Sequence, residues 1–378
     1  MSRAPSVIAA LRAFLPGFLS TRPVLSPPQR RAIWAIQACR TPVLGGHVHA
    51  CADCARRHFA YHSCNHKACP QCGKEATAQW VAREQGKLIG APYFMVTFTL
   101  PEELRGLFFG RDAKAAYDAF FAAASEALRD KLASPKWLGA VNNGFTAVLH
   151  TWNQQMGFHP HLHCIVPGGG LNARGGFVRV KSAQFLLPVP VLSRAFRHHF
   201  KAQMRQRGWQ CDPAVWRVDW GVHIQPFGSG ENAVKYLGAY VARSVIADSR
   251  LLSITDTHVT FRYKDRAQGN ATRTLTLEGT EFCKRYLRHV LPRRLRSIRH
   301  YGFCHPAAKK TRLKIIVLSG KTLHLGAAPP SAAAAPQTRA FPCPCCQRAM
   351  LRIGKIPAHW QQPAPVCARA PPAATAAA

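Results

Sequence analysis

Three histidines alternate with other residues in the stretch Phe158–Cys164. In an extended strand, successive side chains point to opposite faces, so His159, His161 and His163 share one face. Neutral imidazoles bind divalent ions, and two at this spacing can hold an ion while leaving positions open for water or substrate. The alternation therefore favours a metal or phosphate site over a solvated, inert histidine-rich edge strand.

The chain contains fourteen cysteines, and two Cys-x2-Cys pairs lie close together in its first quarter. We expect a cytoplasmic protein, in which thiols stay reduced and metal ligation is favoured over disulfides. Two such pairs can present four thiolates to one tetrahedral ion. We therefore expect a structural Zn²⁺ bound by Cys51, Cys54, Cys69 and Cys72, with Cys64 able to replace one of them or to take part in a second site.

The composition indicates a globular protein with a polyanionic partner. Of 378 residues, 47% are hydrophobic, and 51 Lys and Arg outnumber 17 Asp and Glu to give a net charge of +34. The basic residues extend along the whole chain, which is typical of a nucleic-acid-binding surface. We expect no membrane association, because the sequence has neither an apolar run of about 20 residues nor a cationic amphipathic anchor.

The pattern of apolar residues and turns predicts an α+β fold. Elements are expected at residues 93–100 (strand), 112–133 (helix), 145–152 (strand), 158–167 (strand), 189–207 (helix) and 215–224 (strand). This order suggests an antiparallel sheet with helices packed on one face, related to the ferredoxin-like motif. Further along, we expect a helix over 231–245, a β-hairpin over 255–278 and a basic helical stretch over 282–299 that is broken at Pro292.

The helix expected over 231–245 carries an apolar stripe on one side and two tyrosines on the other. Tyr236 and Tyr240 are one helical turn apart, so their phenols can approach the same point in space. Tyrosines beside an apolar stripe are also common packing residues, and on the helix alone we favour packing. The histidine strand changes this interpretation, because a divalent ion can polarise a phosphate that a phenol attacks.

These features together resemble a known enzyme family. The pair His161-Leu162-His163 with the downstream Tyr236-x3-Tyr240 resembles the HUH endonuclease signature in its two-tyrosine form. Residues 30 to 305 contain further collinear stretches that are similar to the zinc-binding rolling-circle transposases of bacterial insertion sequences: Ala38–Thr41, Leu44–Val48, Phe98–Pro101, Leu149–Trp152, Tyr236–Arg243, His289–Pro292 and Ile298–Gly302. Family members usually carry a histidine directly before the second Cys-x2-Cys pair, where this chain has Ala68.

The resemblance implies an HUH endonuclease domain with a ferredoxin-like, RRM-like sheet, preceded by a zinc-binding module. His161 and His163 would bind Mg²⁺ or Mn²⁺ with a third ligand, for which His159 is the first candidate. One tyrosine would attack single-stranded DNA at a transposon end, keep a 5′-phosphotyrosine and free a 3′-hydroxyl, and the other would repeat the step without a nucleotide cofactor. Further residues are expected to contact DNA phosphates, namely Lys235, Arg243, Arg293, Arg294 and Arg296.

The expected organisation has five consecutive segments. They are a helical segment at 1–38, a zinc-binding DNA-recognition module at 39–90, the catalytic domain at 91–250, its basic extension at 251–325, and an Ala- and Pro-rich tail at 326–378. In the tail, Cys343 and Cys346 are candidate ligands of a second zinc ion, although two cysteines alone cannot complete its site. Two alternatives to a transposase are a plasmid replication initiator or relaxase with the same chemistry, and a catalytically inactive zinc-finger DNA-binding protein.

Overall fold

Each of the two units of the structure is assembled from stretches that lie far apart in the sequence. This computed structural model describes residues 4–72, 74–241, 245–321 and 341–359. The larger unit comprises Met1–Ile36 and Asn65–Ala332, and the smaller comprises Gln37–Cys64 and Ala333–Ala378. The five consecutive segments expected from the sequence differ from this division, because composition along a chain does not show which distant stretches fold together.

A five-stranded sheet forms the centre of the larger unit, and every neighbouring pair in it is antiparallel. In sheet order its strands are β12 (Ile298–Gly302), β4 (Gly144–Trp152), β5 (Phe158–Pro167), β3 (Tyr93–Thr99) and β8 (Val222–Gly228). Helix α4 (Ala113–Ala133) connects β3 to β4, and α5 (Val189–Gln206) connects the β5 side to β8. The chain order β3-α4-β4-β5-α5-β8 is a βαββαβ unit of the ferredoxin-like kind. The predicted α+β class with an antiparallel sheet is confirmed.

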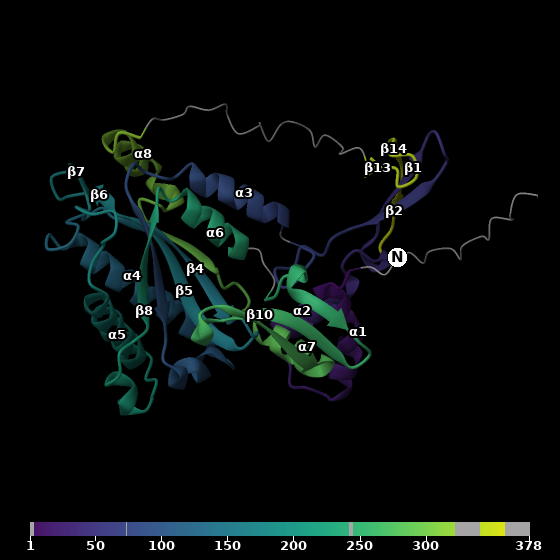
Figure 1. Ribbon diagram of the computed structural model, residues 1–378, viewed down its shortest axis with the longest axis horizontal. Coiled ribbons are helices and arrows are strands. Elements are labelled where there is room, and N and C mark those ends of the chain that lie inside the picture. Colours follow the sequence, from purple (N-terminus) through teal and green to yellow (C-terminus); the bar gives the residue numbers. More distant parts are fainter. Residues whose placement is uncertain (1–3, 73, 242–244, 322–340, 360–378) are drawn as a thin grey trace, which may run out of the picture. The chain divides into compact units, whose positions relative to one another are not determined.

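One face of this sheet holds the main hydrophobic core. Along β3, Phe94, Val96 and Phe98 are fully buried in that core, whereas Met95 packs in a separate cluster on the other face. This is the two-residue period of a strand buried on both faces. Helices α4 and α5 supply many of the other side chains of the main core and lie on the same side of the sheet (Figure 1). Their position agrees with the sequence-based expectation.

The second face is also covered in part by helices, which the sequence analysis did not expect. Helices α3 (Lys74–Gln85), α6 (Glu231–Val241) and α8 (Lys309–Leu318) lie across the sheet from α4 and α5 (Figure 1). Trp80, Val234 and Ile315, one from each helix, pack with residues of the sheet in the second core cluster. This packing fixes α6 above β3 and β5.

The rest of the larger unit surrounds this layer structure. Its helices are α1 (Val7–Ser20), α2 (Pro27–Ala38, which continues into the smaller unit) and α7 (Gly279–Arg288). Its further strands are β6 (Gly169–Leu171), β7 (Phe177–Arg179), β9 (Leu251–Ile254), β10 (His258–Asp265) and β11 (Ala271–Glu278). Strands β10 and β11 form the predicted hairpin, and β9 extends it to a three-stranded sheet.

Two predicted elements have different bounds in the structure. The strand expected over 215–224 begins only at Val222, because a 3-10 turn over Pro213–Trp216 precedes it, with Ala214 N–H donating to the Asp212 carboxylate. The basic stretch over 282–299 is not one helix. Helix α7 ends at Arg288, and residues 298 to 302 form the edge strand β12.

The smaller unit contains a four-stranded sheet made from two hairpins. The first hairpin is β1 (Gly46–Cys51) with β2 (Arg57–Tyr61), and the second is β13 (Phe341–Pro342) with β14 (Ala349–Ile356). Strand β1 pairs with β14, so that Cys51 lies opposite Met350. Within the described part of the chain, helices long and apolar enough to span a bilayer are absent.

The contact between α3 and α6 depends on Gly238. A Cβ atom at this position would lie 2.1 Å from Cγ2 of Val81 on α3. We predict that Gly238→Ala lowers the free energy of unfolding by about 1–3 kcal/mol, because the helices must separate. Gly17→Ala is the matched control, since Gly17 is also helical and has no neighbouring atom within 4 Å. Thermal denaturation should show a lower midpoint for Gly238→Ala only, and equal midpoints for the two variants would contradict this packing.

His289 should make the stability of the larger unit depend on pH. Its buried ring donates from Nε2 to the carbonyl of Met156 at 3.1 Å, and Nδ1 accepts from Thr151 Oγ1 at 3.1 Å. Burial lowers the pKa of His289 to about 4. Below a pH of about 6.5, the unfolded chain therefore takes up a proton that the folded chain does not, and stability falls.

Between pH 7.5 and pH 5 this single group should remove about 2 kcal/mol from the free energy of unfolding. His289→Gln has no titrating ring, so its stability should decline less over the same range. Urea unfolding of both proteins at the two pH values measures the difference. The same decline in both proteins would show that His289 does not resist protonation in the folded state.

Candidate active site

A cluster of three histidines lies on the second face of the central sheet. His161 and His163 project from β5, and His150 projects from β4, where it pairs directly with His161. Ligand nitrogens of the three rings lie within 4.8 Å of one another. The centroids of the His150 and His163 rings are 4.8 Å apart, as are those of His161 and His163. The two predicted histidines of β5, His161 and His163, therefore lie together, and a third imidazole from the neighbouring strand β4 joins them.

Hydrogen bonds orient two of these rings. Nδ1 of His161 donates to the carbonyl oxygen of His159 at 2.7 Å, and Nδ1 of His163 lies 2.9 Å from Oγ1 of Thr97 on β3. Nδ1 is thus hydrogen-bonded in both rings. A partner on the second nitrogen is the usual way in which a protein fixes a metal-binding histidine.

The third ring is held in its neutral form. His150 is 3% exposed, and its burial, followed by the nearby His163 and His161, lowers its pKa well below the usual value. A neutral imidazole has a lone pair for a metal ion, whereas an imidazolium has none. The burial of His150 and the orientation of the other two rings are thus suited to binding a metal ion.

His159, the first candidate for the third ligand, lies outside the cluster. Its Nδ1 is 3.2 Å from a guanidinium nitrogen of Arg105, and its ring centroid is 5.4 Å from that of His161. The third member of the cluster is His150, and the role expected for His159 stays a prediction. The predicted hairpin turn at 153–157 does not give this pairing. Regular counting back from Trp152 opposite Phe158 places His150 opposite Pro160, and only a register shift between His150 and Trp152 brings it opposite His161.

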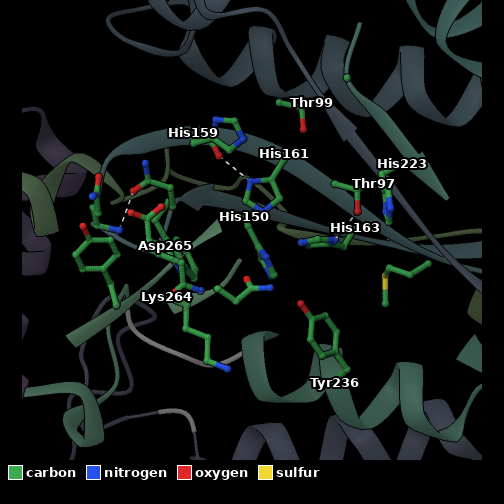
Figure 2. A pocket seen from close by; sticks show the side chains of 18 of the residues that line it. Thr97, Thr99, His150, His159, His161, His163, His223, Tyr236, Lys264 and Asp265 are labelled. Carbon is green, nitrogen blue, oxygen red and sulfur yellow. Dashed lines mark hydrogen bonds between the residues drawn. The ribbon is translucent and has the colours of Figure 1, made fainter. Parts of the chain in front are cut away.

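Tyr236 faces the histidine cluster from helix α6 (Figure 2). Its ring centroid lies 6.5 Å from that of His163 and 5.7 Å from that of Phe227, and the residue is 37% exposed. Ala233 and Val234 are buried against the sheet, which directs the next turn of the helix toward the histidines. The phenol is therefore accessible and on the same face as the imidazoles.

The other residues expected near Tyr236 are less fully described. Lys235 is exposed on α6. Tyr240 lies in α6, one turn after Tyr236, but its side chain is outside the described part of the structure, and Arg243 lies outside the described residues altogether. The roles expected for these residues stay predictions.

A cavity of about 1040 Å³ joins the histidines to Tyr236. Its walls include Arg250 and three neighbours from β10, Tyr263, Lys264 and Asp265, to which the sequence analysis gave no role in the site. Figure 2 shows Lys264 and Tyr236 around the same volume as His150. Arg250 and Lys264 provide positive charge for a phosphate, while the histidines and Tyr236 provide reactive groups.

The arginines expected to bind DNA lie elsewhere. Arg294 and Arg296 line a second cavity of about 470 Å³, together with Lys114, Asp118 and Arg299. Arg293 is exposed on the surface beside Arg294. Their role as phosphate contacts stays a prediction, but none of the three lines the histidine cavity.

The cysteines form two groups of four. Cys39, Cys64, Cys69 and Cys72 have their sulfur atoms within 4.8 Å of one another, and so do Cys51, Cys54, Cys343 and Cys346. The single set of Cys51, Cys54, Cys69 and Cys72 expected from the sequence is thus divided between two groups, and Cys64 belongs to the first. Spacing could not reveal this, because the partners of Cys51 and Cys54 come from the other end of the chain.

Comparison with known proteins gives consistent matches. Residues 144–312 match a family model described as "Putative transposase", and residues 10–100 match one described as "Transposase zinc-binding domain". "Putative transposase y4qJ" of Sinorhizobium fredii is 38% identical over 320 residues, which cover 79% of this chain and 80% of that protein. "Transposase for insertion sequence element IS801" of Pseudomonas savastanoi pv. phaseolicola is 29% identical over 284 residues, which cover 70% of this chain and 68% of that protein. No solved structure gives a significant match.

The matches agree with the site in position and in chemistry. The first matched region contains both strands of the histidine cluster and the helix of Tyr236, and the second contains the group of Cys39, Cys64, Cys69 and Cys72. From the extent of the similarity to the protein of Sinorhizobium fredii, we conclude that this chain belongs to the family of zinc-binding transposases that includes the transposase of IS801.

Proposed function

We propose that this transposase cleaves and rejoins single-stranded DNA at transposon ends through a 5′-phosphotyrosine on Tyr236, by a rolling-circle type of mechanism. The observation that supports the proposal most is the position of Tyr236 across one cavity from His150, His161 and His163. The net charge of +34 supports DNA as the partner. A plasmid replication initiator or relaxase would share this chemistry, but both matched relatives are named transposases.

The three histidines fit a divalent ion. All three donors are imidazoles, two have hydrogen-bonded Nδ1 atoms, and the third is kept neutral by burial. When bound, such an ion polarises a phosphate oxygen and neutralises charge that develops during attack. Nitrogen donors suit a transition ion better than Mg²⁺, which prefers oxygen ligands. We therefore propose Mn²⁺ as the ion that supports cleavage at the lower concentration, with Mg²⁺ as the weaker alternative.

Tyr236 is the proposed nucleophile. Its phenol oxygen attacks the phosphorus of a phosphodiester, a bond between that oxygen and phosphorus forms, and the bond from phosphorus to the 3′ oxygen breaks. The phenol proton passes to water in the cavity, and the departing 3′ oxygen takes up a proton. Attack of a free 3′-hydroxyl on the phosphotyrosine reverses these steps and rejoins DNA without a nucleotide cofactor. We propose that Tyr240 repeats the step on a second strand end.

Positive side chains around the cavity are proposed to hold the DNA backbone. Arg250 and Lys264 line the cavity, and Lys235 is exposed next to Tyr236. The guanidinium of Arg250 is fixed by donation to the carbonyl oxygens of Gln154 and Arg262, so that it is positioned before DNA arrives. In addition, we propose the group of Cys39, Cys64, Cys69 and Cys72 as the zinc site of the matched zinc-binding domain.

The central test is the formation of a covalent adduct. Full-length protein is incubated with Mn²⁺ and single-stranded oligonucleotides that tile both ends of the element carrying this gene. A 3′-labelled strand should become attached to the protein, while a 5′-labelled strand should be released as a shorter free product with a 3′-hydroxyl. Tyr236→Phe should abolish the adduct, because Tyr240 is proposed to act only on a second strand end, after Tyr236 has made the first cleavage.

Tyr263→Phe is the matched control, because Tyr263 also lines the cavity but projects from β10. This variant should form the adduct as the parent protein does. An adduct that survives Tyr236→Phe, or one that is lost equally in both variants, would contradict the assignment of Tyr236 as nucleophile.

A second experiment distinguishes the two candidates for the third ligand. His150→Ala should raise the Mn²⁺ concentration needed for half-maximal cleavage by about 10-fold or more, since it removes a direct ligand. His159→Ala should leave that concentration nearly unchanged, because His159 lies outside the cluster. Fluorescence anisotropy with labelled DNA should give equal DNA affinity for both variants in the absence of metal. A large shift for His159→Ala and none for His150→Ala would overturn the ligand set.

A further inference from the structure

We propose that Cys51, Cys54, Cys343 and Cys346 bind a second structural Zn²⁺, which makes residues 341–359 an integral part of the smaller unit. The four cysteines come from the two hairpins of its sheet, β1–β2 and β13–β14. The matched zinc-binding domain ends at residue 100, so two of the four proposed ligands lie outside it.

The distances between the sulfur atoms fit a tetrahedral ion. Cys51 Sγ lies 3.4 Å from Cys346 Sγ, Cys54 Sγ lies 3.5 Å from Cys343 Sγ, and Cys346 Sγ lies 3.9 Å from Cys54 Sγ. A zinc ion with Zn–S bonds of about 2.3 Å places its ligands about 3.8 Å apart. Disulfide sulfurs would be only about 2.05 Å apart, and these four cysteines are free thiols.

The two Cys-x2-Cys loops have matching backbone geometry. In the first, Cys51 N–H donates to the carbonyl of Arg56 at 3.0 Å, and in the second, Cys343 N–H donates to the carbonyl of Arg348 at 2.7 Å. Each acceptor lies five residues after the first cysteine. In addition, the residue four positions after that cysteine has a positive φ in both loops, 53° at Ala55 and 59° at Gln347. Two loops that repeat the same turn present their thiols in the same way, which suits a site built from two equal halves.

The sheet brings the two loops to the same end of the unit. Strand β1 runs into the first loop at Cys51, and β14 leaves the second loop at Ala349, while the two strands pair antiparallel from Gly46 opposite Ile356 to Cys51 opposite Met350. The last pair of this register therefore lies next to both cysteine loops. Backbone pairing, independently of the sulfur positions, requires the four thiols to converge.

The smaller unit has little other means of stabilisation. Its buried cluster consists of Cys51, Cys343 and Met350 among the described residues. A core of this size cannot offset the conformational entropy of two hairpins, and small modules of this kind depend on a metal ion or disulfides. Ion binding would supply that free energy, because a tetrathiolate site exists only when the hairpins are folded.

The exposure of some of these thiols allows a test that needs no amino-acid substitution. Cys54 and Cys346 are exposed, as is Cys345, which lies beside the group but outside it. In zinc-loaded, reduced full-length protein, iodoacetamide should modify Cys345 quickly and should spare Cys54 and Cys346, because their sulfur atoms are bound to the ion. After removal of zinc by a chelator, all three should react. Peptide mass spectrometry measures each site, and modification of Cys54 and Cys346 as fast as Cys345 in the zinc-loaded protein would overturn the proposal.

Zinc content measured by elemental analysis gives an independent result. The double variant Cys343→Ser with Cys346→Ser should contain one zinc equivalent per chain less than the parent, and Cys345→Ser should contain as much as the parent. An unchanged zinc content in the double variant would refute the site. Where the double variant is insoluble, the alkylation experiment decides, since it needs no substitution. Neither experiment depends on DNA cleavage, so the second zinc site and the proposed function can fail separately.

Discussion

The antiparallel pairing of β4 with β5 is the interaction on which the candidate site depends. This register places His150 opposite His161 on one face and Leu149 opposite Leu162 on the other. Both leucines are buried in the core beneath α4 and α5, where each contributes about 1.5–3 kcal/mol. A slip of one residue would bury a histidine in place of a leucine, so the hydrophobic core selects the register that assembles the imidazoles.

The two faces of the central sheet therefore have different roles. The face covered by α4 and α5 is continuously apolar and provides most of the stability, whereas the other face changes along its length. Where Met95, Val148 and Ile165 project, α3, α6 and α8 pack on it, and where the histidines project, it opens to the cavity. Helix α6 belongs to both regions, because Val234 is buried in the packed part while Tyr236 reaches over the open part. The packing of Val234 against the sheet thus determines where the phenol of Tyr236 lies.

The sequence was sufficient for features that depend on local periodicity. The βαββαβ order, the hairpin of β10 with β11, and the placement of His161 and His163 on one face of a strand follow from periods of 2 and 3.6 residues. His150 was missed because its position arises from a cross-strand pair, and regular pairing across the turn at 153–157 would place it opposite Pro160, whereas a register shift places it opposite His161. The partners of Cys51 lie nearly 300 residues away, and neither spacing nor propensity can reveal a pairing of that kind. The packing of helices on the second face was missed for a similar reason, since α3 and α8 join the sheet only through tertiary packing.

The central claim is that three imidazoles from two strands form one metal site facing Tyr236. A crystal structure of the protein soaked with Mn²⁺, recorded at a wavelength where manganese scatters anomalously, tests it most directly. We predict a single strong anomalous peak within bonding distance of ring nitrogens of His150, His161 and His163, on the side of the cavity that faces Tyr236. A peak bound to His159 in place of His150, or no peak on this face of the sheet at saturating Mn²⁺, would contradict the claim.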